Sequence, residues 1–162
     1  MNQLGELAEA VARQLVGSGE TVAVAESSTG GLISASLLAV PGASAYYRGG
    51  SVIYTLEARR ELLGITREDV LGLEPLTEAM VARFAQLARR QLDATWAVAE
   101  LGVAGPTRAR YGHPPGISVL AVDGPRPRTL AVDTGSDDRE ENMWRFTRAA
   151  LDLLLQALND SG

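Results

Sequence analysis

The sequence has no cysteine, which excludes a disulfide framework and zinc sites built on thiolates. His113 is the single histidine, so a histidine-rich metal site is excluded as well. We therefore expect no metal and no other cofactor.

Lysine is also absent, and all fifteen cationic side chains are arginines. An arginine side chain stays protonated, so it cannot accept a proton during a reaction. The chain consequently has no lysine base and no amine side chain that forms a Schiff base with a carbonyl substrate.

Long apolar runs are missing too. No stretch has enough consecutive apolar residues to span a bilayer, and residues 1–6 lack the basic region and apolar run of a signal peptide. We expect a cytoplasmic protein with no membrane partner. The net charge of −5 argues against sequence-independent binding to nucleic acid, so we expect no nucleic-acid partner either.

The remaining composition is that of a globular protein, with 46% hydrophobic and 22% charged residues. A chain of 162 residues is long enough for one core and too short for two ordinary domains. We expect a single domain over residues 1–162.

Helical and strand patterns alternate along the chain. Apolar residues at three- and four-residue spacing predict helices over 4–16, 32–40, 57–63, 78–90 and 139–158. Short β-branched or apolar runs predict strands over 21–25, 51–54, 95–101, 116–122 and 128–132, with a glycine-punctuated connection over 43–50. This order predicts a three-layer α/β/α sandwich around a mixed, mostly parallel sheet of about five strands, antiparallel at one end.

One strand-turn-helix segment, 22–32, has features of a binding site. The first N–H groups of a helix attract an anionic or polarised oxygen, and Gly30 and Gly31 would let a ligand approach them closely. Thr29 is a candidate N-cap, and the hydroxyls of Ser27 and Ser28 lie beside it in the sequence. The alternative is a plain capped turn without a ligand.

Two other predicted strands also end in polar or glycine residues, like those at 27–31. Tyr54, Thr55 and Arg59 form one corner, and 102–106 (GVAGP) forms another. Strand ends of this kind gather at one edge of an open α/β sheet, where ligands bind. The polar loop 107–115 is then either an exposed, mobile loop or a lid or anion clamp over the strand ends.

Together these motifs resemble the CinA C-terminal domain family, over nearly the whole chain. The matching segments, in order, are 25–31 (AESSTGG), 41–46 (PGASAY), 50–54 (GSVIY), 57–59 (EAR), 62–64 (LLG), 102–106 (GVAGP), 115–116 (PG) and 138–139 (DR). The resemblance implies a three-layer fold, a homo-oligomer of two or more chains, and a nucleotide as small-molecule partner. It also implies hydrolysis of the amide of nicotinamide mononucleotide (NMN) to nicotinic acid mononucleotide and ammonia, a step of pyridine nucleotide recycling.

The family's site residues carry over by position. The catalytic positions correspond to Ser27, Tyr54 and Arg59. The substrate-binding positions correspond to Ser28, Thr29, Gly30, Gly31, Thr55, Gly102, Gly105 and Arg139.

Five of the family's positions differ in this chain. Arg59 stands where the family has a lysine that activates a serine, and Ser28 stands where a cysteine is usual. Leu56 replaces an asparagine and Leu101 a threonine or serine, while Met143 replaces a second arginine. Glu26, Tyr54 and His113 are candidate substitutes for the missing base.

Two hypotheses follow from these differences. The first is a CinA-like amidohydrolase that works through a rearranged site. The second is a non-catalytic nucleotide-binding or interaction module of the same fold.

Overall fold

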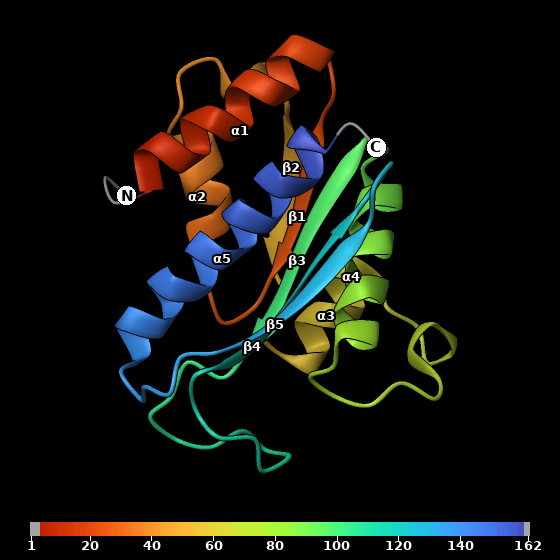
Figure 1. Ribbon diagram of the computed structural model, residues 1–162. Helices are drawn as coiled ribbons and strands as arrows, with labels where there is room; N and C mark the ends of the chain where they lie inside the picture. The colour runs from red at the N-terminus through yellow and green to blue at the C-terminus, as the bar shows by residue number, and fades with distance from the viewer. Residues whose placement is uncertain (1–3, 161–162) are drawn as a thin grey trace.

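The computed structural model describes residues 4–160, and a five-stranded sheet runs through the middle of them (Figure 1). The strands are β1 (Val22–Glu26), β2 (Tyr47–Val52), β3 (Trp96–Gly102), β4 (Ile117–Asp123) and β5 (Arg128–Asp133), in the spatial order β2-β1-β3-β4-β5. β1 pairs in parallel with β2 and β3, whereas β4 pairs antiparallel with β3 and β5. Four of these strands thus run in one direction and β4 opposes them, which confirms a mixed, mostly parallel sheet.

Helices cover both faces of the sheet (Figure 1). One face carries α1 (Gly5–Ser18), α2 (Leu32–Leu38) and α5 (Arg139–Asn159), and the other carries α3 (Leu56–Leu63) and α4 (Glu78–Gln91). Short 3₁₀ turns lie at Ala43–Ala45 and Glu68–Val70. None of the helices within residues 4–160 is long and apolar enough to cross a membrane.

The central strand β3 separates two hydrophobic cores, because successive side chains of a strand point to opposite faces. Trp96 and Val98 pack on the side of α1, α2 and α5, whereas Ala97, Ala99 and Leu101 pack on the side of α4. This arrangement confirms the predicted three-layer sandwich. It also explains why β1 and β3 have no polar alternation, since both of their faces are covered.

Side-chain caps fix where three helices begin. The Thr55 hydroxyl accepts a hydrogen bond from the N–H of Ala58, at 3.0 Å, and starts α3. Thr77 does the same for α4 and Asp138 for α5. The observed start agrees with the predicted one at the same residue for α4 and within one residue for α3.

The prediction for β2 was wrong in its position. The strand begins at Tyr47 and runs through Gly49 and Gly50, which had been assigned to a connection before a strand at 51–54. A Cβ added to Gly50 would lie 2.7 Å from the carbonyl oxygen of Val24 on the neighbouring strand. The close approach of the two strands, rather than a turn, accounts for this glycine.

The carboxyl ends of β1, β2, β3 and β5 lie at one edge of the sheet, because these strands run the same way. The segments at that edge are 27–31, 53–55, 103–116 and 134–138. The first three contain the corners singled out in the sequence, so their predicted gathering at one edge is confirmed.

Candidate active site at the carboxyl edge of the sheet

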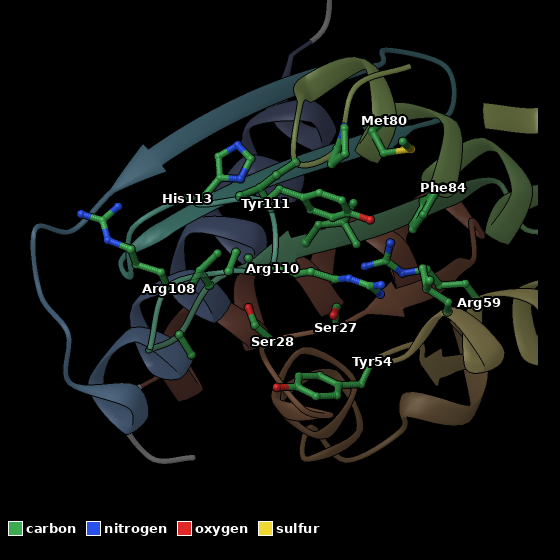
Figure 2. A pocket seen from close by; sticks show the side chains of 18 of the residues that line it. Ser27, Ser28, Tyr54, Arg59, Met80, Phe84, Arg108, Arg110, Tyr111 and His113 are labelled. Carbon is green, nitrogen blue, oxygen red and sulfur yellow. The ribbon is translucent and has the colours of Figure 1, made fainter. Parts of the chain in front are cut away.

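A cavity of about 600 Å³ opens at this edge (Figure 2). Seven of the residues predicted from the sequence line it: Ser27, Ser28, Tyr54, Arg59, Gly102, Gly105 and Arg139. They come from the turns after β1 and β2, from α3, from the end of β3 and from the start of α5. Residues more than a hundred positions apart in the chain thus face a single space.

The other four predicted residues do not line this cavity. Thr29 is completely buried, and Gly30 and Gly31 are absent from the cavity wall. Thr55 borders a smaller adjoining hollow with Tyr54 and Arg59.

The start of α2 is occupied by the chain's own Glu26. This fully buried carboxylate accepts hydrogen bonds from the N–H groups of Gly31, Ile33 and Ser34, at 3.0, 3.1 and 3.0 Å. These N–H groups are therefore already paired within the chain, which favours the alternative of a capped turn without a ligand at the start of α2. Thr29 is not the N-cap either, since Gly31 holds that position and the Thr29 hydroxyl donates to Glu26 at 2.6 Å.

A second buried carboxylate, Glu100, lies beneath the same turn. Its Oε1 accepts hydrogen bonds from the N–H groups of Ser27 and Thr29, at 2.9 and 3.0 Å, and lies 2.9 Å from the oxygen of the Thr29 hydroxyl. Its Oε2 accepts a hydrogen bond from the Ser28 hydroxyl. Burial raises the pKa of Glu100 above its ordinary value of 4.5, and the bonds from Ser28, Thr29 and Ser27 oppose that rise.

Glu100 was missed by reasoning from the sequence. The signal was a single acidic residue between Ala99 and Leu101, inside a strand that is otherwise apolar and covered on both faces. A buried charge requires partners, so its position in β3 already indicated a polar group on the neighbouring strand end.

Arg59 borders the cavity from α3 and lies against Phe84. The centre of its guanidinium is 5.3 Å from the ring centroid, within the range of a cation–π contact. Its Nε is buried and has no hydrogen-bond partner in the described residues. Burial lowers the pKa of Arg59, while Tyr111 and Glu100 raise it, and a protonated guanidinium has no lone pair with which to act as a base.

Arg139 joins two other corners of the cavity. Its Nη1 donates to the carbonyl oxygen of Gly105 at 2.6 Å, and its Nη2 donates to the Tyr54 hydroxyl at 3.0 Å. Gly105 has a φ of +98°, and an added Cβ would lie 2.8 Å from Pro115. The glycine therefore lets the chain after β3 pass close to the segment that precedes β4.

The loop 107–115 supplies another wall. Arg108, Arg110, Tyr111 and His113 all line the cavity, and Figure 2 shows Arg110 and Arg59 extending toward each other from opposite sides. Arg108 donates to the carbonyl oxygen of Gly112 at 3.0 Å, which ties the loop to itself. The loop thus borders the cavity while most of its residues remain exposed, which is compatible with both alternatives.

The cavity wall is strongly cationic. Five arginines and no aspartate or glutamate line it, although the whole chain has a net charge of −5; the arginines are Arg59, Arg60, Arg108, Arg110 and Arg139. Such a wall favours an anionic ligand, most simply a phosphate ester. No group of three or more potential metal ligands was found among the described residues.

Comparison with known proteins identifies a matching family model and similar sequences. Residues 4–158 match the model of the CinA C-terminal domain. CinA-like proteins of Gloeobacter violaceus and Fervidobacterium nodosum are 36% and 33% identical over 91% and 94% of the chain. These matches cover 35% and 38% of the relatives, so the chain spans little more than a third of their length.

Solved structures agree over almost the full chain. A CinA superfamily protein of Klebsiella pneumoniae 700603 superposes with a TM-score of 0.87 at 30% identity, covering 95% of this chain and 96% of that one. A competence/damage inducible protein of Agrobacterium tumefaciens gives 0.85 at 32% identity, covering 97% and 96%.

Proposed function

The chain belongs to the CinA C-terminal domain family, and we propose that it hydrolyses the amide of nicotinamide mononucleotide or a related nucleotide. The products are the corresponding acid nucleotide and ammonia. The observation that carries this proposal is the meeting of two serine hydroxyls with a wall of arginines in one cavity.

Each half of that observation matches one half of the substrate. The arginines suit the phosphate of a mononucleotide, because guanidinium groups donate charge-assisted hydrogen bonds to its oxygens. The serines suit the amide, because acyl transfer needs a nucleophile at the carbonyl carbon. Arg139 donates a hydrogen bond to the Tyr54 hydroxyl, which links one of these arginines to a second residue of the cavity wall.

A second candidate function is nucleotide binding without turnover. It is favoured by Arg59, which cannot take a proton from Ser27, and by the Ser27 hydroxyl, for which the described residues supply no acceptor. In this alternative the cavity binds the nucleotide through its arginines and the protein acts through its bound state.

Incubation of the purified protein with NMN separates the two functions. We expect release of ammonia together with nicotinic acid mononucleotide, and a rise in melting temperature with ligand concentration. A rise in melting temperature without ammonia supports the binding module. Neither effect with NMN rejects this ligand for both functions.

A further inference from the structure

One of the serine and threonine side chains in the cavity wall donates a hydrogen bond to a carboxylate. Ser27, Ser28 and Thr107 line the cavity, and only Ser28 among these three donates to a carboxylate, that of Glu100. We infer that Ser28 is the nucleophile of this site and Glu100 its general base, in place of a pairing of Ser27 with the residue at position 59. This inference rests on the hydrolysis proposed above.

The carboxylate is fixed in the orientation that the reaction needs. Two backbone N–H groups, of Ser27 and Thr29, hold Oε1 of Glu100 from the same turn that carries Ser28. Oε2 is thereby directed at the Ser28 hydroxyl. A nucleophile, a base and a group that orients the base are the three parts of an activated hydroxyl.

Gly102 provides the space for this pair. A Cβ added to Gly102 would lie 2.6 Å from Oγ of Ser28 and 2.9 Å from Oε2 of Glu100. Any other residue at the end of β3 would push the two groups apart. The glycine thus keeps open the point where Ser28 meets the cavity, and Figure 2 shows Ser28 and Ser27 side by side at its base.

Burial suits Glu100 to this role. An exposed carboxylate is a weak base at neutral pH, and a base is most effective when its pKa lies nearer the working pH. Burial raises the pKa of Glu100 in that direction. Ser28 itself is buried but borders the cavity.

The proposed reaction has two steps. Oγ of Ser28 attacks the amide carbon and its proton passes to Glu100; the C–N bond then breaks as Glu100 returns that proton to the leaving nitrogen, which departs as ammonia. Water next attacks the ester, giving its proton to Glu100, and the C–Oγ bond breaks as Ser28 takes the proton back. The sum is amide plus water to acid plus ammonia.

The intermediate oxyanion has a donor close by. The Ser28 N–H has no acceptor in the described residues, whereas both neighbouring N–H groups, of Ser27 and Thr29, are held by Glu100. A free N–H on the nucleophile itself is a suitable donor for the oxygen that becomes negative.

Acyl labelling tests the pair without a nucleotide. The protein is reacted with p-nitrophenyl acetate, quenched in acid and mapped by mass spectrometry. Because the chain has no lysine, no lysine amine competes for the acetyl group. We expect the acetyl group on Ser28, and we expect Glu100→Gln to slow its transfer by at least about 100-fold, the usual contribution of a general base.

Glu26→Gln is the matched control. Glu26 is also a fully buried carboxylate hydrogen-bonded to Thr29, but it holds the start of α2, is absent from the cavity wall and has no hydrogen bond to Ser27 or Ser28 in the described residues, so it is not their base. Labelling of this variant should stay within about threefold of the wild-type rate, since its base is intact. Circular dichroism establishes that both glutamine variants are folded.

The outcomes are distinguishable from those of the proposed function. One result is that Ser28 is acetylated at a rate that falls in the Glu100→Gln variant, while the protein releases no ammonia from NMN. This result supports Ser28 and Glu100 as nucleophile and base, and it rejects only NMN as the substrate. Acetyl on Ser27 alone, no acetyl on either serine, or equal labelling of the Glu100→Gln variant overturns the pair. Ammonia release that survives Ser28→Ala overturns it as well.

Discussion

Glu26 and Glu100 have different roles in one turn. Both are fully buried and both lie within hydrogen-bond distance of the Thr29 hydroxyl. Glu26 holds the first N–H groups of α2, whereas Glu100 holds the N–H groups that flank Ser28 and the Ser28 hydroxyl. The first carboxylate therefore stabilises a helix start, and the second positions the serine that faces the cavity.

The raised pKa of Glu100 predicts how the stability of the fold depends on pH. In the unfolded chain this carboxyl loses its proton near its ordinary pKa of 4.5, while the folded protein holds the proton to higher pH. The free energy of unfolding of the wild type, relative to that of the Glu100→Gln variant, is thus greatest below pH 4.5. It falls as the pH rises from there to the folded pKa, by at most about 1.4 kcal/mol per pH unit.

Urea unfolding of both proteins from about pH 4 to about pH 8 measures this difference. The contributions of the other carboxyl groups to the pH dependence cancel, because both proteins contain those groups. A difference that rises with pH, or stays constant, would show that Glu100 has no raised pKa.

Arg139→Gln tests the binding of the anion. We expect the affinity for NMN to fall about 10- to 100-fold, because charge-assisted hydrogen bonds contribute about 1.5–3 kcal/mol. Isothermal titration measures the affinity. Arg145→Gln is the control, since Arg145 lies on the same helix and pairs with Glu141 at 3.4 Å outside the cavity; an equal loss in both variants would contradict a specific role for Arg139.

Residues at strand ends were the ones that the sequence revealed. Ser27 and Tyr54 follow apolar strand patterns and Gly102 begins a glycine-rich corner, and such positions are recognisable from local pattern. Glu100 was not recognised, because its partners lie more than seventy positions away in the chain. Thr29 was misread as a cap because one sequence cannot reveal that Glu26 folds back over the start of α2.

Among the secondary-structure elements, the positions of helices were predicted better than those of strands. Threonine caps and three- to four-residue spacing are local, so the starts of α3 and α4 followed directly from the sequence. The start of β2 did not, because Gly49 and Gly50 are typical of turns and their place in the sheet depends on the neighbouring β1.

The N-cap of α4 leads to a prediction about the stability of the protein. Thr77→Ala removes the hydroxyl that accepts the N–H of Met80 at 3.2 Å, and we expect a loss of about 1 kcal/mol and a fall of roughly 2–4 °C in melting temperature. Thr107→Ala is the control, because Thr107 is exposed and its hydroxyl has no hydrogen bond in the described residues. We expect this variant to change the free energy of unfolding by less than about 0.5 kcal/mol. Differential scanning calorimetry compares them; equal melting temperatures would contradict the role of the cap.

Charge is unevenly distributed over the molecule as a whole. The chain is acidic overall, yet five arginines face the cavity, so an anion is drawn to this edge of the sheet. We expect the dissociation constant for NMN to rise steadily with salt concentration. The Arg108→Gln/Arg110→Gln double variant should show a shallower dependence; an affinity that is independent of salt would contradict this reading.

The homo-oligomer implied by the resemblance stays a prediction. Light scattering coupled to size exclusion should give a mass at least twice the 17.1 kDa of one chain. A mass equal to one chain across the usable concentration range would contradict it.

Hydrolysis at the carboxyl edge of the sheet is the central claim, and ammonia release from NMN tests it most directly. The wild type is measured beside a Ser27→Ala/Ser28→Ala double variant that unfolds at the same temperature. We predict several molecules of ammonia per wild-type chain and none above background from the variant. Equal release from both proteins, or none from the wild type, would contradict the claim.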